Sequence, residues 1–307
     1  MRKRIYSVDV GGTSIKYGVF DSKKKLLKAW SVPTDVAIGS EAILEAIATE
    51  IKNDCEDVSQ LFGVGLGFPG TVNEGIVIKA PNLNWEMVDV KAALTRLLGE
   101  KVVIAVENDA NLAALGEYRS SSIDSDAMVL FTLGTGIGGG IVLNGKLWRG
   151  HNGLAAEIGH LDIGMFDFVC GCGETSCFET VASATGIKRL ATMYIDNKRF
   201  NTSIETVYSA KQIFDAAKTG DKLALHVVDK AALAIAKATR MIALVLNPDT
   251  VLIGGGVSEA GSFLIERIEE NYQALNRGIQ IPVSFQTASL GNQAGLYGGY
   301  EAVKDYG

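Results

Sequence analysis

Apolar and polar residues follow a pattern that occurs twice along this 307-residue chain. Residues 5–27 read as an apolar stretch, a glycine turn, an alternating stretch, a polar turn and the start of a third apolar stretch, and residues 128–148 repeat a similar order. Such patterns predict β-strands, so each copy predicts a strand, a glycine turn and a returning strand. The repeat therefore predicts an internal duplication, with two related α/β domains facing one another across a ligand-binding cleft.

Most other segments carry helical or strand periodicity. Further strands are expected over the ranges 61–70, 101–106 and 249–254. Helices are expected over the ranges 41–55, 110–118, 181–196, 208–217, 221–247 and 294–307, with another after the glycines at 254–256. We expect the last helix to return to the first domain. The predicted small domain then comprises residues 1–120 with about 295–307, and the large domain residues 121–294.

Composition and charge exclude two classes of partner. A formal net charge of −6 and a pI near 5.3 leave no positive footprint for nucleic acid or an anionic membrane. The basic start Met1–Arg4 precedes an apolar run that stops at Asp9, too short for a signal peptide, and no membrane-spanning stretch follows. We therefore expect a cytoplasmic protein, in which clustered thiols are more often metal ligands or catalytic groups than disulfides.

Three glycine-rich turns follow apolar strands, at residues 11–13, 134–140 and 254–256. Any one of them could serve only as a tight turn. The second contains G-x-G-x-x-G and G-x-x-x-x-G-K matches, but a strand follows it, and Leu147 stands where a P-loop needs Ser or Thr. Together the turns lie at the carboxyl ends of strands, where glycine lets backbone amides approach phosphate oxygens. They predict a phosphate-binding site.

His160, Cys170, Cys172 and Cys177 lie within eighteen residues of a chain that has only 4 cysteines and 3 histidines. The cluster could be a disulfide staple, a redox pair or a metal cage. The compartment disfavours a disulfide, and C-x-C followed by four residues is not the C-x-x-C of a thioredoxin-type pair. One nitrogen and three sulfurs form a complete tetrahedral set for structural zinc. Cys55 has no predicted role.

Several segments in order carry a family resemblance. The stretch "DVGGTSIKYGVF" resembles the first phosphate loop of the sugar kinase, actin and heat-shock ATPase superfamily. With "ENDANLAALGE", "LGTGIGGG", "EIGH" and "CGCGETSCFE", the chain is similar from residue 5 to about 300 to the ROK family of sugar kinases, above all to its bacterial glucokinase-like members. The resemblance implies a two-domain actin-like, ribonuclease-H-like ATPase fold, with duplicated mixed sheets and an interdomain cleft. It also implies ATP-dependent phosphorylation of a hexose, D-glucose first, with magnesium.

Asp109 matches the family's catalytic base. From its position alone, between a predicted strand and a predicted helix, Asp109 would be read as a helix N-cap. The resemblance reverses that reading, and the chemistry agrees, because a sugar hydroxyl that attacks ATP must lose a proton to a nearby group. Asp9 matches a residue that helps to position magnesium near the transferred phosphate.

The other site residues are carried over by the same resemblance. The implied sugar-binding residues are Asn82, Asn108, Asp109, Glu157, His160 and Glu179. The implied ATP-binding and phosphate-binding residues are Asp9, Gly11, Gly12, Thr13, Lys16, Gly134, Thr135, Gly136, Gly254, Gly255 and Gly256. The cysteine and histidine spacing also matches the family's zinc motif, so one ring nitrogen of His160 would bind zinc while the other donates to a sugar hydroxyl.

Two departures and several alternatives bear on the substrate. Ser176 and Phe178 stand where family members commonly have Gly and Trp or Ile, and both are expected near the sugar site. Fructose, mannose, N-acetylmannosamine and β-glucosides therefore stay open as substrates, and polyphosphate as a donor. The family also includes sugar-responsive repressors, whose DNA-binding domain precedes the first phosphate loop; here that loop begins at Asp9. A chaperone-like or cytoskeletal ATPase would not need the zinc cage. The resemblance implies a homodimer.

Overall fold

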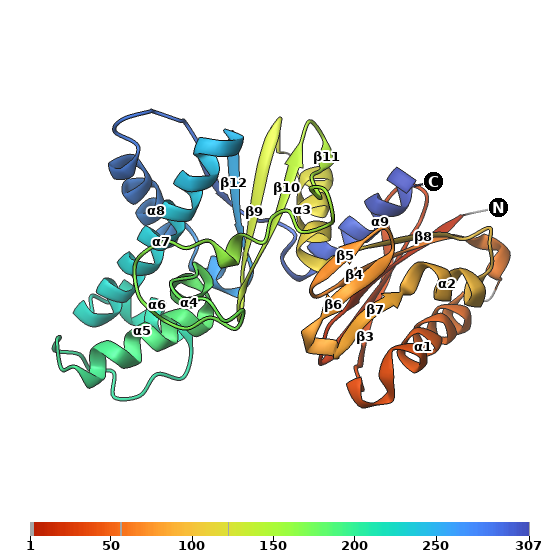
Figure 1. The fold of residues 1–307 in the computed structure, drawn as a ribbon, viewed down its shortest axis with the longest axis horizontal. Coiled ribbons are helices and arrows are strands. Elements are labelled where there is room, and N and C mark those ends of the chain that lie inside the picture. The colour runs from red at the N-terminus through yellow and green to blue at the C-terminus, as the bar shows by residue number, and fades with distance from the viewer. Residues whose placement is uncertain (1–2, 56, 122, 307) are drawn as a thin grey trace.

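The structure is a computed structural model that describes residues 3–55, 57–121 and 123–306. The chain forms two lobes, and both marked termini lie on the lobe built mainly from the first third of the sequence (Figure 1). We call this the small lobe and the other the large lobe. The expected domain bounds of 1–120 with 295–307 and of 121–294 stay our proposal. Residues 1, 2 and 307 lie outside the described residues.

The small lobe is built on a five-stranded mixed sheet of order β3-β2-β1-β4-β8. β1 pairs antiparallel with β2, β2 pairs antiparallel with β3, and β4 and β8 run parallel to β1. The strands are β1 (Arg4–Val10), β2 (Ser14–Phe20), β3 (Leu26–Pro33), β4 (Leu61–Phe68) and β8 (Val103–Asn108). Parallel strands bring the carboxyl ends of β1, β4 and β8 to one edge, which faces the other lobe.

The large lobe repeats this arrangement in a sheet of order β11-β10-β9-β12-β13. Its strands are β9 (Ala127–Leu133), β10 (Ile137–Leu143), β11 (Lys146–Leu147), β12 (Thr250–Gly254) and β13 (Ser284–Thr287). β12 and β13 run parallel to one another and β12 to β9, whereas β9, β10 and β11 pair antiparallel. The same strand order in both lobes confirms the duplication that the hydrophobic pattern predicted.

A third, antiparallel sheet on the small lobe was not predicted. It consists of β5 (Thr71–Asn73), β6 (Ile76–Ala80) and β7 (Trp85–Asp89), followed by helix α2 (Val90–Leu98). Buried Trp85 packs against Phe68 at the end of β4, with ring centroids 5.3 Å apart. These strands are only three to five residues long, and so short a run carries little alternation by which sequence could reveal it.

Helices cover both faces of the small-lobe sheet. On one face, α1 (Gly39–Asp54) and α2 bury their apolar residues in a core with β1 and β4. On the other face, α9 (Ala294–Tyr306) packs with residues of β1, β2 and β8. Helix α3 (Asp109–Ser120) stands between the lobes (Figure 1) and contributes Leu112 to the small-lobe core and Ala114 to a core with the large-lobe strands.

Helices α3 and α9 cross at two glycines. A Cβ atom on Gly116 would lie 2.1 Å from the Ala294 carbonyl oxygen, and one on Gly298 would lie 1.8 Å from the Leu112 oxygen. The two backbones therefore approach more closely than any larger side chain allows. Because α9 follows the last large-lobe strand, this contact joins the lobes.

The large lobe carries five α-helices among its described residues: α4 (Glu179–Ala182), α5 (Ala184–Asp196), α6 (Ala210–Lys218), α7 (Lys222–Leu246) and α8 (Ser262–Leu275). The helix expected over 181–196 is two helices, because Ser183 accepts a hydrogen bond from the Gly186 amide and caps a new one. Helix α7 ends at Asn247, which adopts a left-handed conformation before Pro248. Within the described ranges, every helix is too short or too polar to cross a membrane.

Candidate active site

A cavity of about 420 Å³ lies where the two lobes meet. Its lining comes from both: the end of β8 and the start of α3 on the small lobe, and the β9–β10 turn and segment 153–160 on the large lobe. It brings together ten of the residues predicted from sequence: Asn82, Asn108, Asp109, Gly134, Thr135, Gly136, Glu157, His160, Glu179 and Gly255. Its volume is within the range of small-molecule sites.

The remaining residues predicted to bind sugar or phosphate do not line this cavity: Asp9, Gly11, Gly12, Thr13, Lys16, Gly254 and Gly256. The β1–β2 turn nevertheless contacts the cavity wall, because a Cβ atom on Gly12 would lie 2.9 Å from the Asn82 carbonyl oxygen. Asp9 forms an ion pair with Lys16, with 3.2 Å between Oδ2 and Nζ. The first turn therefore meets the cavity through Asn82.

Asn108, and not Asp109, caps helix α3. The Asn108 Oδ1 atom accepts a hydrogen bond from the Asn111 amide at 3.0 Å, and its Nδ2 atom donates to the Gly70 carbonyl at 2.9 Å. Asp109 is the first residue of the helix, so reading it as the N-cap is wrong. With the capping role filled by its neighbour, the Asp109 carboxylate is available to the cavity.

The surroundings of Asp109 raise its pKa to about 6. Burial is the largest cause, and the negative charges of Asp9 and Glu157 add to it, while the Ala110 amide opposes the shift by donating a hydrogen bond. A carboxyl group with this pKa is mostly ionised at neutral pH yet more basic than an exposed aspartate. Those are the properties of a general base.

The acidic residue Glu179, at the start of α4, links two parts of the site. Its Oε1 atom accepts a hydrogen bond from the Cys170 thiol at 2.9 Å, and its Oε2 atom accepts one from the Ile137 amide at 3.3 Å. Ile137 begins β10 directly after the glycine turn. Glu179 therefore connects the β9–β10 turn to the cysteine cluster.

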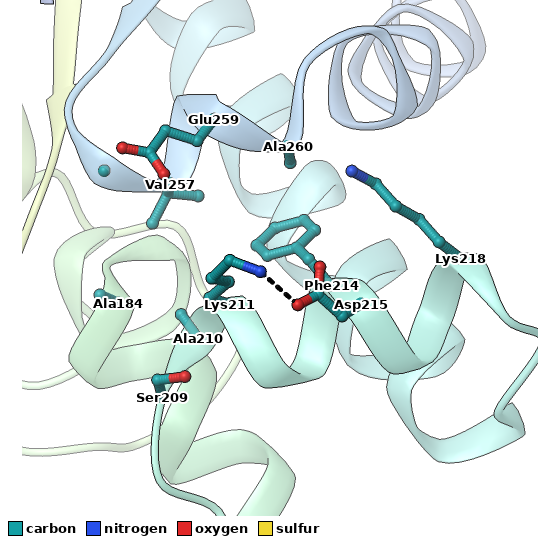
Figure 2. A pocket seen from close by; sticks show the side chains of 11 residues that line it. Ala184, Ser209, Ala210, Lys211, Phe214, Asp215, Lys218, Val257, Glu259 and Ala260 are labelled. Atoms are coloured by element: carbon teal, nitrogen blue, oxygen red, sulfur yellow. Dashed lines mark hydrogen bonds and ion pairs between the residues drawn. The ribbon is translucent and has the colours of Figure 1, made fainter.

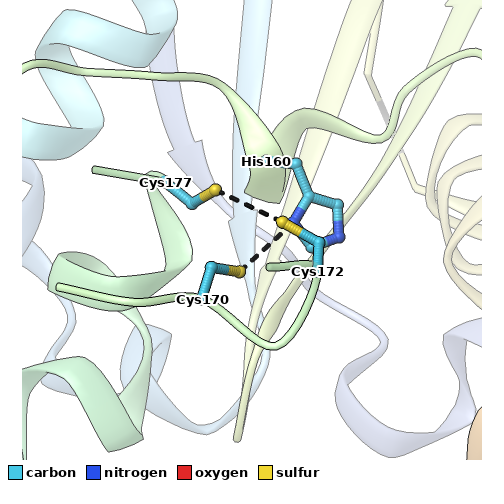
Figure 3. A group of neighbouring side chains, drawn as sticks. All are labelled: His160, Cys170, Cys172 and Cys177. Atoms are coloured by element: carbon cyan, nitrogen blue, oxygen red, sulfur yellow. Dashed lines mark hydrogen bonds between the residues drawn. The ribbon is translucent and has the colours of Figure 1, made fainter. Parts of the chain in front are cut away.

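His160 and the three cysteines converge as sequence spacing predicted (Figure 3). One ligand atom from each lies within 4.8 Å of all the others. The Sγ atoms of Cys172 and Cys177 are 3.7 Å apart, and the Cys170 Sγ atom is 3.5 Å from Nδ1 of His160. These separations are far longer than a disulfide bond of ~2.05 Å. Ligand atoms around tetrahedral zinc lie about 3.5–3.8 Å apart, so the donor set fits zinc in kind and these two pairs fit it in spacing.

The thiols of the cluster differ in acidity. Burial raises the pKa of Cys170 and of Cys177, whereas the backbone amide of Glu174 lowers the pKa of Cys172 by hydrogen bonding to its sulfur. A metal ion held here would take thiolates, so its binding would release protons and weaken at low pH.

Comparison with known proteins assigns the family. The sequence profile of the ROK family matches residues 5–305. The chain belongs to the ROK family. It is 39% identical over 312 residues to a glucokinase of Halalkalibacterium halodurans, covering 97% of this chain and 94% of that protein. It is 37% identical over 280 residues to a glucokinase of Thermotoga maritima, covering 87% and 86%.

Solved structures of the ROK family confirm the fold class. A ROK family glucokinase from Streptomyces griseus, in complex with glucose and AMPPNP, superposes with a TM-score of 0.79 at 31% identity, covering 98% of this chain and 99% of that one. The chain therefore has the two-domain actin-like ATPase fold that the phosphate-loop resemblance implied.

A second cavity of this ROK-family chain, of about 390 Å³, adjoins the third glycine turn. Figure 2 shows its walls: α6 on one side and the short 3-10 helix Gly256–Ala260 on the other. Lys211 and Asp215 pair on α6, facing Glu259 across the space, and Phe214 forms part of the floor. The sequence predicted the glycine turn and a helix over 208–217, but not that this helix, α6, lines a cavity, because its lining residues form no recognisable motif.

Phe178, which was expected near the sugar site, directly precedes the cavity residue Glu179, and its side chain is fully buried against Phe131 in the large-lobe core, with ring centroids 5.6 Å apart. Several residues that line the cavity were not predicted from the sequence. The missed lining residues include Pro69, Gly70, Gly153 and Ala155. These belong to loops, and their only sequence signal was the Pro-Gly turn that ends β4.

Proposed function

We propose that this protein transfers the γ-phosphoryl group of ATP to a hexose, converting D-glucose to glucose 6-phosphate and ADP. One observation carries the proposal: the ionisable base Asp109 faces the same cavity as the glycine turn Gly134–Gly136 and the polar residues Glu157 and His160. The glucokinases among its relatives support glucose as the substrate.

Asp109 would act as the general base. A carboxylate within hydrogen-bond reach of the attacking hydroxyl accepts its proton as the new P–O bond forms and the bond to ADP breaks. Its raised pKa strengthens it as a proton acceptor near neutral pH. The sugar's other hydroxyls would bind to the polar residues around the cavity: Asn82, Asn108, Glu157, His160 and Glu179.

Backbone amides would hold the phosphates. The turn Gly134–Gly136 lines the cavity, and the matching turn of β1–β2 lies beside it. In an acidic protein, turn amides replace the basic side chains that an anion otherwise needs. The second cavity, which adjoins Gly256, is where we place the base and ribose of the nucleotide.

Asp9 fits a role toward magnesium. Its side chain is 26% exposed at the end of β1, and its charge raises the pKa of Asp109. Two carboxylates that repel one another near a triphosphate favour a divalent cation between them and the phosphates. Magnesium, when bound, neutralises charge that develops on the transferred phosphate.

The four-residue cluster would hold zinc in a structural role. His160, Cys170, Cys172 and Cys177 fill a tetrahedral shell, so no position stays open for catalysis. With Nδ1 of His160 toward the metal, its Nε2 atom is free to donate to a sugar hydroxyl. A reducing cytoplasm, where we place the protein, keeps the thiols available.

We also propose a homodimer, as the family resemblance implies. Met241, Leu244 and Val245 expose one apolar face of the last turns of α7, with Val245 83% exposed, and Arg240 ties this helix to exposed Ile279. An apolar face of this kind favours association. Light scattering is expected to give a dimer for the natural chain and a monomer for Leu244→Asp, and a monomeric natural chain would refute this part of the proposal.

A panel of hexoses tests the reaction. ADP release is measured with D-glucose, mannose, fructose, N-acetylmannosamine and a β-glucoside, with ATP and magnesium. We expect glucose to give the highest kcat/KM, and Asp109→Asn to abolish most of the turnover. Turnover with another sugar alone would refute the choice of glucose, and turnover with none would refute the kinase itself.

A further inference from the structure

Segment 149–157 of the large lobe crosses to the small lobe beside the cavity. It follows β11, and its last residue, Glu157, leads into the short helix that ends at His160. The Ala155 amide donates a hydrogen bond to the Arg149 carbonyl at 3.2 Å, so the segment closes on itself as a loop. We call residues 149–157 the strap. It contains Glu157 and leads to His160, two of the residues that we assign to the sugar.

The strap is joined to the small lobe at its first residue. Arg149 forms an ion pair through Nε with the Glu107 carboxylate, and its guanidinium lies 5.7 Å from the ring centroid of Tyr306 on α9. Glu107 is 2% exposed, and a carboxylate so deeply buried needs a charged partner. None of the roles assigned above uses this pair.

Glu107 also holds the residues next to it. Its Oε1 atom accepts hydrogen bonds from the Asn108 amide and from Nδ2 of Asn111, each at 3.1 Å, while its Oε2 atom accepts from Arg149. One carboxylate thus fixes the start of α3, where Asp109 lies, and the start of the strap. Networks of charged hydrogen bonds hold such geometry more rigidly than single contacts.

A second contact fixes the middle of the strap. Gly153 has a φ of +80°, and a Cβ atom there would lie 2.1 Å from the Val72 carbonyl oxygen on β5 of the small lobe. Only glycine allows this approach. The strap therefore meets the small lobe at Glu107 and at Val72, and these two contacts set its distance from Asp109.

We propose that Glu107 and Arg149 are positioning residues for phosphoryl transfer: their ion pair holds Glu157 and His160 of the large lobe in register with Asp109 of the small lobe. This rests on the proposed function for the identity of the reacting groups. Neither Glu107 nor Arg149 lines either of the two cavities. Its contribution is the alignment of groups from two lobes, where a displacement of ~1 Å can cost about 10²-fold in rate.

Kinetics of four variants test the pair. Arg149→Met retains the aliphatic stem and removes the charge, and we expect kcat/KM for glucose to fall about 10²-fold while KM for ATP changes less than about threefold. Glu107→Gln should cause a similar loss. The double variant should be no worse than either single one, because both remove the same interaction. Arg149→Lys keeps the positive charge but lacks the planar guanidinium group, so it should retain more activity than Arg149→Met.

Arg119 provides a matched control. It also reaches from α3 to the large lobe, donating to the Gly145 carbonyl at 2.8 Å, and it pairs with Asp305 at 3.6 Å, with an exposure equal to that of Arg149. It lines neither cavity. Arg119→Met should keep kcat/KM within about threefold of the natural chain. Thermal unfolding of each variant separates general destabilisation from the loss of alignment.

Hydrogen exchange over residues 149–157 tests the geometry without any turnover. We expect faster exchange of the strap amides in Arg149→Met and in Glu107→Gln, and unchanged exchange in Arg119→Met. Multiplying losses in the double variant, or a strap that exchanges equally in all variants, would overturn the proposal. A natural chain without hexose kinase activity would refute the proposed function, while the exchange result would still decide whether the pair holds the strap.

Discussion

The two glycine hairpins have strands of the same length and different chemistry. In the small lobe, the seven residues of β1, a three-residue turn and the seven residues of β2 match β9, its turn and β10 in the large lobe, each 123 positions later. The burial pattern of β1 is identical to that of β9. At equivalent positions, however, the first hairpin has Asp9 and the second has Thr132.

This difference shows which part of the duplication serves the fold and which serves the reaction. Apolar residues at matching positions rebuild the same sheet twice. The carboxylates at strand ends occur in the small lobe, with Asp9 at the end of β1 and Asp109 directly after β8, whereas Ala288 and Ser289 follow β13 in the large lobe. Phosphate-binding turns can be duplicated, but two sets of acids would repel the triphosphate. We infer that the small lobe supplies the base and the carboxylate assigned to magnesium, and the large lobe most of the binding.

Among the proposed variants, replacement of Asp109 should lower the reaction rate most. Asp109→Asn keeps the size of the side chain and removes the proton acceptor, so we expect kcat to fall about 10²–10⁴-fold. Glucose affinity, measured by calorimetry, should change by less than about tenfold, because the amide still offers hydrogen bonds. A variant with more than a tenth of the natural kcat would show that the base lies elsewhere.

Variants at the equivalent positions Asp9 and Thr132 compare the contributions of the two hairpins to the reaction. Asp9→Asn should lower kcat about 10²–10³-fold, since it removes a charge placed to organise the cation and phosphate. Thr132→Val, at the equivalent position, should lower kcat less than about tenfold, because it removes only a neutral hydroxyl. Initial rates at saturating ATP and magnesium give both values. Equal losses would mean that the hairpins contribute alike.

The cysteine cluster belongs to the large lobe alone and tests whether binding resides there. Cys172→Ala should lose zinc, measured by elemental analysis, and weaken glucose binding about 10–100-fold, since His160 and Glu179 both contact the cluster. Cys55→Ala, a buried cysteine in the small-lobe core, is the control and should retain the metal. A zinc-free variant with unchanged glucose affinity would show that glucose binding does not depend on the metal.

The smallest effect is expected at Ser176. This residue has a φ of +61°, a left-handed conformation that costs a non-glycine residue about 1–2 kcal/mol. Ser176→Gly relieves that strain but gains flexibility when unfolded, so the unfolding midpoint should rise by about 1–3 °C. Differential scanning calorimetry measures the shift. A lower midpoint would show that the serine hydroxyl contributes more than the strain costs.

The sequence predicted the features that arise from periodicity or spacing within one segment. It did not predict the contacts between residues far apart in the chain. The hairpins, α7 and the cysteine cage follow from periodicity or spacing within one segment. The pairing of Glu107 with Arg149 and the approach of Gly153 to Val72 join residues that are far apart in sequence. The buried position of Phe178 likewise depends on how α4 packs against β9. Family resemblance supplied the role of Asp109, which the strand-to-helix pattern alone assigned to capping.

The pH dependence of the reaction tests the central claim, that Asp109 is a base whose pKa is raised by burial and by neighbouring acids. With both substrates well below their KM values, the profile reports the free enzyme. We predict that activity falls as pH drops below about 6, where Asp109 becomes protonated, and that Asp9→Asn moves this limb to lower pH by removing a like charge. The ionisation of ATP is common to both enzymes and cancels in the comparison. Activity that persists to about pH 4, as for an ordinary aspartate, or a limb that Asp9→Asn leaves in place, would contradict the account.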